Sequence, residues 1–141
     1  MQELRAFLKK LRVLLVDDEE EFITTLAERL SMRGVQVSVV LDGKEAFSAV
    51  ESHSPHIVVL DMMMPGIRGA DILARIKASH PHVHVLMLSG HSNTADREEV
   101  MALGAFDYLT KPLHFDELLQ KLYEAGHASL DSQPHEAKVV A

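Results

Sequence analysis

Three kinds of feature are absent or scarce in this sequence, and each absence narrows the function. There is no cysteine, which excludes disulfide bonds, thiol nucleophiles and zinc–thiolate sites. No apolar run approaches the roughly 20 residues that span a bilayer, and residues 1–10 carry no secretory signal pattern. Positive charge is scarce, since 14 Lys and Arg stand against 21 Asp and Glu, a net charge of -7 at pH 7. We therefore expect a cytoplasmic protein that contacts neither membranes nor nucleic acid directly, because nucleic-acid phosphates require basic partners.

The hydrophobic pattern predicts the fold class. Short apolar runs alternate with segments of helical period, which indicates βαβ units and a parallel sheet. Because the runs are nearly continuous in apolar residues, helices should cover both faces of the sheet. We predict an α/β domain with a doubly wound, five-stranded parallel sheet. Its predicted strands cover residues 12–16, 35–40, 57–60, 83–88 and 105–110.

The length of 141 residues fits one such domain with a short segment at each end. Residues 11–128 should form the domain itself. Residues 1–10 contain enough apolar side chains for a short amphipathic turn, and residues 129–141 should form a flexible C-terminal tail. Within the domain, Asp42 and Glu45 have the spacing of a capping box at the start of a helix.

Polar residues stand where the predicted strands end. Asp17 and Asp18 follow the first strand, Asp61 follows the third, Ser89 follows the fourth and Lys111 follows the fifth. The carboxyl ends of parallel strands share one edge, where open α/β folds bind their ligands. Three crowded carboxylates repel one another, and a divalent cation relieves this repulsion. An all-oxygen site suits Mg²⁺ better than zinc, which favours His and Cys.

Taken together, these motifs resemble the receiver domain of two-component response regulators, the chemotaxis receivers among them, over roughly residues 10–128. The resemblance implies the flavodoxin-like strand order 2-1-3-4-5. It also implies that the chain is a phosphoacceptor and not an enzyme, apart from catalysing its own phosphorylation and dephosphorylation. The motifs that carry it are Asp17-Asp18, Asp61-Met-Met-Met-Pro65-Gly66, Ser89-Gly90 and Lys111-Pro112.

The resemblance assigns a metal site to the acidic residues. Asp18 and Asp61 would bind Mg²⁺ directly, and Asp17 would bind it through water. The backbone carbonyl of Met63 would supply another oxygen, in keeping with the preference of this cation for oxygen ligands.

The resemblance also assigns roles around a phosphoryl group. Asp61 would accept it from a sensor histidine kinase or a phosphotransfer protein and form an acyl phosphate. Lys111 would neutralise one phosphoryl oxygen as a compact positive charge, and Ser89 would donate a hydrogen bond. The bond between Lys111 and Pro112 would be cis, a geometry that proline permits at modest cost.

A switch is implied as well. Phosphorylation would draw Ser89 toward the phosphoryl group, and Tyr108 would turn inward. The surface of residues 92–127 would then change and control a downstream protein target, or pair two phosphorylated copies as a homodimer. Met63 and His91 occupy positions that tune the phosphate lifetime, which predicts slow to intermediate self-dephosphorylation. The helix expected at about 93–103 has few large apolar residues and should be the least firmly packed.

Several alternatives remain at this point. A flavin-binding module shares the fold, but its phosphate loop would be the acidic segment 17–21. A phosphohydrolase of the haloacid dehalogenase type would need a second Asp where Met63 stands. A phosphate-independent pseudo-receiver scaffold, a phosphorelay intermediate, and a receiver fragment of a larger regulator are also open. Alternating histidines at 80, 82 and 84 could form a metal cluster. We favour a solvated loop, because they lie near the amino end of the fourth predicted strand, away from the predicted site.

Overall fold

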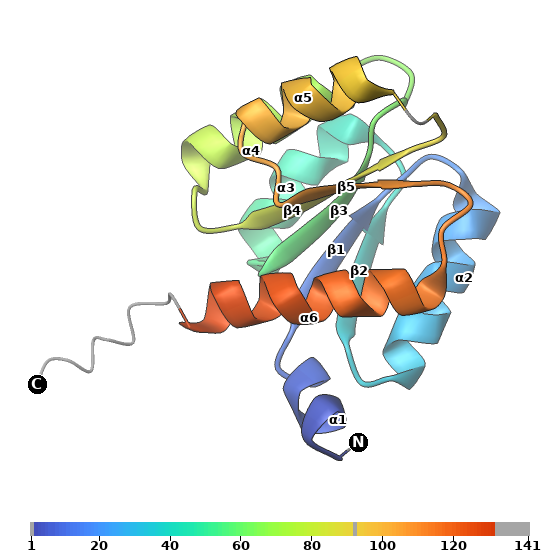
Figure 1. Ribbon diagram of the computed structural model, residues 1–141, viewed down its shortest axis with the longest axis vertical. Coiled ribbons are helices and arrows are strands. Elements are labelled where there is room, and N and C mark those ends of the chain that lie inside the picture. Colours follow the sequence, from blue (N-terminus) through green and yellow to red (C-terminus); the bar gives the residue numbers. More distant parts are fainter. Residues whose placement is uncertain (1, 92, 132–141) are drawn as a thin grey trace, which may run out of the picture.

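The computed structural model describes residues 2–91 and 93–131, and its centre is a parallel sheet with the order β2-β1-β3-β4-β5 (Figure 1). The predicted fold class and strand order are therefore confirmed, although strand boundaries shift by one or two residues. The strands are β1 (Arg12–Val16), β2 (Gln36–Val40), β3 (Ile57–Asp61), β4 (His84–Ser89) and β5 (Asp107–Thr110).

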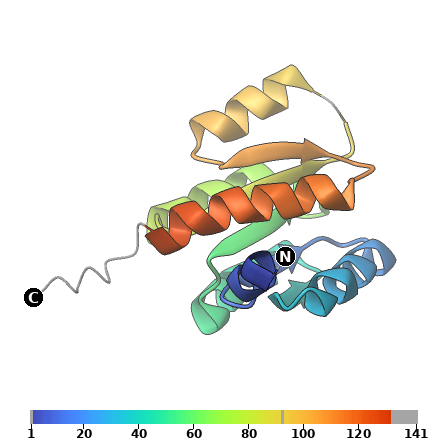
Figure 2. The same ribbon diagram turned by 60° about the horizontal axis from the view of Figure 1, so that its bottom comes forward.

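Helices cover both faces of this sheet (Figures 1 and 2). On one face, the apolar side chains of α3, α4 and α5 pack against the strands, and on the other those of α1, α2 and α6 do so. None of the helices in the described ranges is both long and apolar enough to cross a bilayer. The helices are α1 (Gln2–Leu8), α2 (Glu20–Met32), α3 (Gly43–His53), α4 (Gly69–Ser79), α5 (Thr94–Ala102) and α6 (Phe115–Asp131).

The strands explain why the core has two halves. Side chains alternate between the faces of a strand, so Leu14 and Val16 of β1 point to the α3–α4 side while Val13 and Leu15 point to the α2–α6 side. All the residues of β3 are buried. This two-sided burial fixes the register of the sheet, because a slip by one residue would move every side chain to the opposite face.

Local signals explain the helix ends. Asp42 caps α3, and its side chain accepts a hydrogen bond from the backbone N–H of Lys44 at 2.8 Å. In the predicted capping box, that side chain would accept from the backbone N–H of Glu45. The backbone N–H of Glu45 donates to the carbonyl of Asp42 instead. Gly34 follows α2 with φ of 97°, a left-handed conformation that glycine adopts without a steric penalty. Helix α5 buries only Val100 among its residues, which agrees with its expected weak packing.

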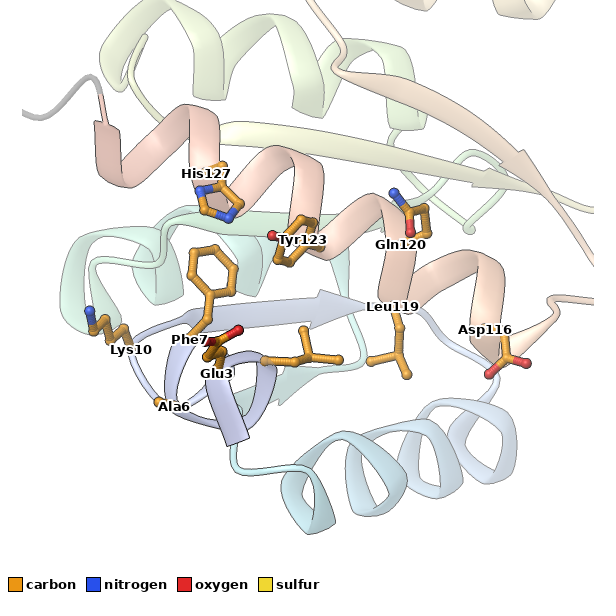
Figure 3. Close-up of a pocket in the computed structure, with 10 residues that line it drawn as sticks. Glu3, Ala6, Phe7, Lys10, Asp116, Leu119, Gln120, Tyr123 and His127 are labelled. Carbon is orange, nitrogen blue, oxygen red and sulfur yellow. The ribbon is translucent and has the colours of Figure 1, made fainter. Parts of the chain in front are cut away.

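Helices are found at both ends of the described part of the chain. The expected amphipathic turn is the helix α1, and it packs on α6 (Figure 3). The Phe7 ring stacks on His127 with 4.3 Å between ring centroids and lies edge-on to Tyr123. A groove of about 660 Å³ runs between these two helices. Helix α6 extends to Asp131, past the expected domain boundary at 128, and residues 132–141 of the expected tail lie outside the described residues.

A buried histidine ties the amino ends of β1 and β3 together. His56 is 5% exposed, and its Nδ1 accepts the backbone N–H of Arg12 at 3.0 Å. Its own backbone N–H donates to the Arg12 carbonyl at 2.9 Å. Burial, together with the nearby Arg12 and His82, lowers the pKa of His56 below its usual 6.5. The fold therefore requires the neutral imidazole, because a protonated Nδ1 could not accept this hydrogen bond.

This predicts an acid-sensitive contribution to stability. In the unfolded chain His56 takes up a proton near pH 6.5, whereas the folded chain resists protonation, so acid favours unfolding. The contribution of His56 to the free energy of unfolding should therefore fall by roughly 1 kcal/mol between pH 7.5 and 5.5. Asp61, whose pKa is raised to about 6, acts in the opposite direction, so the test is the difference in pH dependence between His56→Asn and the wild type. Urea unfolding at both pH values measures this. His53→Asn, at an exposed position, serves as the control, and an unchanged pH dependence in His56→Asn would refute the assignment.

Candidate functional site

The predicted site residues meet at the carboxyl edge of the sheet. Asp17 directly follows β1, Asp61 ends β3, Ser89 ends β4 and Lys111 follows β5. The sheet register aligns them, because Asp61 pairs with Leu88 while Ser89 pairs with Thr110. Asp17, Asp61 and Ser89 are buried, whereas Asp18 is exposed. The predicted convergence of three carboxylates, one hydroxyl and one ammonium is therefore present.

The carboxylates form a cluster with an excess of negative charge. One oxygen from each of Asp17, Asp18 and Asp61 lies within 4.8 Å of the others, and this is the only group of three potential ligands among the described residues. Burial is the main cause that raises the pKa of Asp61 to about 6, and Asp17 adds to it by repulsion. The backbone N–H of Met63 and the Lys111 ammonium oppose this rise. The cluster therefore suits a divalent cation, which would compensate the charge.

The Asp17 carboxylate is also suited to a cation. Its Oδ1 accepts the backbone N–H of Glu19 at 2.9 Å. Its Oδ2 is buried and accepts no hydrogen bond from any described residue, although the Lys111 ammonium lies 3.0 Å away. Buried polar atoms nearly always have a partner. An oxygen-seeking cation at this edge of the sheet would supply one.

The loop after β3 is fixed close behind Asp61. The backbone N–H of Met63 donates to Asp61 Oδ1 at 3.3 Å, and the N–H of Gly69 donates to the Met62 carbonyl. A Cβ at position 69 would lie only 2.7 Å from the backbone of Asp61 and Met62, so glycine is required for α4 to begin here. The Met63 side chain points outward and is 65% exposed. The backbone around Asp61 is thus rigid while the adjacent side chain is open to solvent.

Lys111 reaches the site from the loop after β5. Its backbone N–H donates to the Ser89 carbonyl at 2.7 Å, and its bond to Pro112 is cis, as the resemblance implied. Its ammonium contacts the carboxylate of Glu19 and lies 3.9 Å from Asp61 Oδ2. Burial acts to lower the pKa of Lys111, but Glu19 and Asp17 outweigh it and the pKa is raised. Glu19 is not among the site residues predicted from the sequence, where its only signal is its place next to the acidic pair.

The two proposed switch residues meet at one carbonyl group. The Ser89 hydroxyl donates to the backbone oxygen of His91 at 2.9 Å, and the His91 N–H donates back to Ser89 Oγ. The Tyr108 hydroxyl donates to the same His91 oxygen at 3.0 Å. Tyr108 is buried, so it already has the inward position that we expected only after phosphorylation. The Ser89 hydroxyl is held by its two hydrogen bonds to the backbone of His91, in the loop after β4.

Ion pairs link the three elements α5, β5 and α6. Asp107 of β5 lies 3.5 Å from Arg97 of α5 and 2.7 Å from Lys121 of α6. Burial alone would raise the pKa of Asp107, but the Lys121 ammonium and the backbone N–H of Tyr108 outweigh it and lower the pKa. Arg97 also donates to the Tyr108 carbonyl. The Arg97 side chain of α5 therefore connects this helix to the backbone of Tyr108.

The histidines near the start of β4 have separate partners. His80 Nε2 lies 3.1 Å from Glu51, and the His84 ring packs edge-on against Phe106. The rings of His80 and His82 are 6.3 Å apart at their centroids. Within the described ranges, the nitrogens of these histidines do not gather into a three-ligand group.

Comparisons with known proteins agree with this geometry. A family model described as the response regulator receiver domain matches residues 13–123. The transcriptional regulatory protein TcrA of Mycobacterium tuberculosis is 37% identical over 138 residues, covering 88% of this chain and 54% of that protein. The chain spans about half the length of the curated relatives it matches. The flavin and phosphohydrolase alternatives gain no support from these matches.

Solved structures match over most of the chain. A receiver domain protein from Clostridium thermocellum superposes with a TM-score of 0.82 at 29% identity, covering 87% of this chain and 99% of that one. A structure described as the BeF3-activated DrrB receiver domain gives a TM-score of 0.74 at 29% identity, covering 82% of this chain and 96% of that one.

The crowding of charge predicts opposite effects for two substitutions. In EDTA at pH 7.5, Asp17→Asn should raise the free energy of unfolding by about 1 kcal/mol, because it removes one of two buried, repelling carboxylates. Lys111→Met should lower it by roughly 1–2 kcal/mol, because it removes the ammonium that compensates them. Urea unfolding measures both, and Asp18→Asn at the exposed position should have a smaller effect. Destabilisation by Asp17→Asn equal to that of Lys111→Met would contradict this electrostatic account.

Proposed function

The chain belongs to the response regulator receiver domain family, and from this premise we propose that it is a phosphorylation-activated signalling switch in which Asp61 accepts the phosphoryl group. One observation carries the proposal. The buried Asp61 carboxylate stands in a cluster of three acids, with the Lys111 ammonium 3.9 Å away, at the open edge of the sheet. Burying a carboxylate costs free energy of folding. A residue that served only the stability of the fold would not keep a charge at this position.

The cluster fits a Mg²⁺ cofactor, which receiver domains bind at their acidic pocket. Asp17, Asp18 and Asp61 would hold it, together with the backbone carbonyl of Met63. The buried Asp17 Oδ2, which accepts no hydrogen bond from the described residues, and the all-oxygen donor set support this assignment. When bound, the cation supplies positive charge that neutralises phosphoryl oxygens.

The residues of the chain then perform a phosphoryl transfer. An Asp61 carboxylate oxygen forms a bond to phosphorus while the bond between phosphorus and the donor breaks, which leaves an acyl phosphate on Asp61. With a pKa raised to about 6, Asp61 is mainly ionised and reactive at neutral pH. Lys111 moves onto a phosphoryl oxygen as a positive charge. The Ser89 hydroxyl donates a hydrogen bond to another.

The signal leaves through the loop after β4. To reach the phosphoryl group, the Ser89 hydroxyl must leave the His91 carbonyl, which Tyr108 also binds. Ser89 and Tyr108 thus share one hydrogen-bond acceptor, and the movement of one changes the bonding of the other. The result is a population shift of the surface formed by α5, β5 and α6. Helix α5 buries only Val100, so its displacement disrupts little packing.

Met63 and His91 set the proposed lifetime of the phosphate. The Met63 side chain lies open to solvent beside Asp61 and cannot orient an attacking water through a strong hydrogen bond. The His91 side chain is exposed and would orient such a water through a ring nitrogen. We propose slow to intermediate self-dephosphorylation, to which His91 contributes.

The partners are proposed from the same premise. A sensor histidine kinase or a phosphotransfer protein would donate the phosphoryl group in the cytoplasm, and a downstream protein would read the α5–β5–α6 surface, with a phosphorylation-dependent homodimer as one form of this. TcrA is a transcriptional regulatory protein about twice as long as the matched segment. A second candidate function is therefore the receiver part of a larger transcriptional regulator. A phosphorelay intermediate and a pseudo-receiver scaffold are further alternatives.

Intact mass after incubation with acetyl phosphate and Mg²⁺ tests the proposal. The wild type should gain one phosphoryl group, and Asp61→Asn should gain none. EDTA during the reaction should prevent the gain, because the carboxylates then lack their cation.

The matched control is Asp71→Asn, which removes an exposed aspartate at the start of α4 and should leave the mass gain unchanged. No gain in the wild type, together with failure to bind beryllofluoride, would reject the switch and support a phosphate-independent scaffold.

A further inference from the structure

The Lys111 ammonium is held mainly by the start of α2 and not by Asp61. It forms an ion pair with Glu19 and lies 3.0 Å from Asp17 Oδ2. It also stands 4.7 Å from the centre of the Phe22 ring, in a cation–π arrangement. Its distance to Asp61 Oδ2 is longer, at 3.9 Å. Lys111 must therefore change partners before it can serve a phosphoryl group on Asp61.

Glu19 is built to hold Lys111 on that side. It occupies the N-cap position of α2, yet its side chain makes no capping hydrogen bond. Its backbone is fixed, because its N–H donates to Asp17 Oδ1 at 2.9 Å. The carboxylate is thus free to reach across to the loop after β5. Its side chain is 60% exposed, so the ion pair with Lys111 lies on the solvent side of the carboxylate cluster.

We propose that Glu19 is a positioning residue that restrains Lys111 at the start of α2, and that phosphorylation of Asp61 transfers the ammonium from Glu19 to the phosphoryl group. This inference rests on the proposed function. Glu19 and the phosphoryl oxygens compete for one ammonium, and Glu19 thereby sets how readily the phosphorylated state forms. The competition is direct, since an ammonium is a compact charge that one anion can take from another.

Glu21 offers a matched control for this proposal. It is an exposed glutamate two residues further along, it lines the same surface groove beside Lys111, and it forms no ion pair with Lys111 in the part of the chain that the structure describes. Glu19→Gln and Glu21→Gln change the net charge by the same amount. A general loss of repulsion toward an anion would affect both variants equally, whereas loss of the restraint would affect only Glu19→Gln.

Beryllofluoride binding in the presence of Mg²⁺ measures the competition. Its apparent dissociation constant, from amide NMR shifts, should be about threefold to fivefold smaller for Glu19→Gln than for the wild type, the size expected of a partly exposed ion pair. Glu21→Gln should match the wild type. Glu19→Asp keeps the charge but shortens the reach by one methylene, so it should behave like Glu19→Gln if the contact itself is the restraint.

A second readout needs no phosphoryl mimic. In EDTA, ¹³C relaxation at Cε of Lys111 should report a more mobile side chain in Glu19→Gln than in the wild type, with Glu21→Gln unchanged. Equal mobility in all three proteins would overturn the restraint even if the wild type did not bind beryllofluoride. A further outcome is that the wild type fails to bind beryllofluoride while the Lys111 side chain is more mobile in Glu19→Gln. That result would reject the phosphoacceptor function and the transfer of Lys111, but it would support the restraint of Lys111 by Glu19.

The remaining outcomes also decide the matter. Weaker binding of beryllofluoride by Glu19→Gln would show that Glu19 presents Lys111 to the ligand, which contradicts the competition. Equal tightening by Glu19→Gln and Glu21→Gln would assign the effect to net charge and also overturn the proposal.

Discussion

The structure depends on one electrostatic constraint, which is that three carboxylates and the Lys111 ammonium share one edge of the sheet. A parallel sheet brings the carboxyl ends of its strands together, and here two of these acids are buried. Burial, and after it the repulsion from Asp17, raises the pKa of Asp61 to about 6. The same excess of charge draws Lys111 toward Asp17 and Glu19 and makes the site suited to a divalent cation. Reactivity, cation binding and the position of Lys111 are three consequences of this arrangement.

The rest of the fold is packed tightly on one side of that edge and sparsely on the other. Two-sided packing fixes β1 and β3, and the close approach of Gly69 fixes the backbone behind Asp61. Helix α5, on the other side of Ser89, buries only one residue and is tied to its neighbours by surface ion pairs. Such pairs contribute little stability. Change at the site can therefore move α5 without disturbing the strands that hold the carboxylates.

The amino-acid sequence predicted this site well where its residues end apolar strands. The apolar runs that precede Asp17, Asp61 and Ser89 are nearly continuous, which predicts strands buried on both faces of a parallel sheet. The convergence of these three residues followed from the geometry of such a sheet. The strand order came from the resemblance, because periodicity does not specify which strands are neighbours.

Contacts between distant segments could not be predicted in the same way. The ion pair of Glu19 with Lys111 joins residues 92 positions apart, and nothing local marks it. The shared bonding of Ser89 and Tyr108 to a backbone carbonyl depends on loop conformation. The docking of α1 on α6 depends on ring stacking that the apolar pattern of residues 1–10 does not reveal.

Calorimetric titration of Mg²⁺ at pH 7.5 tests the central claim most directly, since that claim concerns a cluster of acids that lacks positive charge. The account predicts one binding site in the wild type and, because Asp17→Asn removes a buried charge from the cluster, an affinity at least about tenfold weaker in that variant. Absence of Mg²⁺ binding by the wild type, or equal affinity in the two proteins, would contradict it.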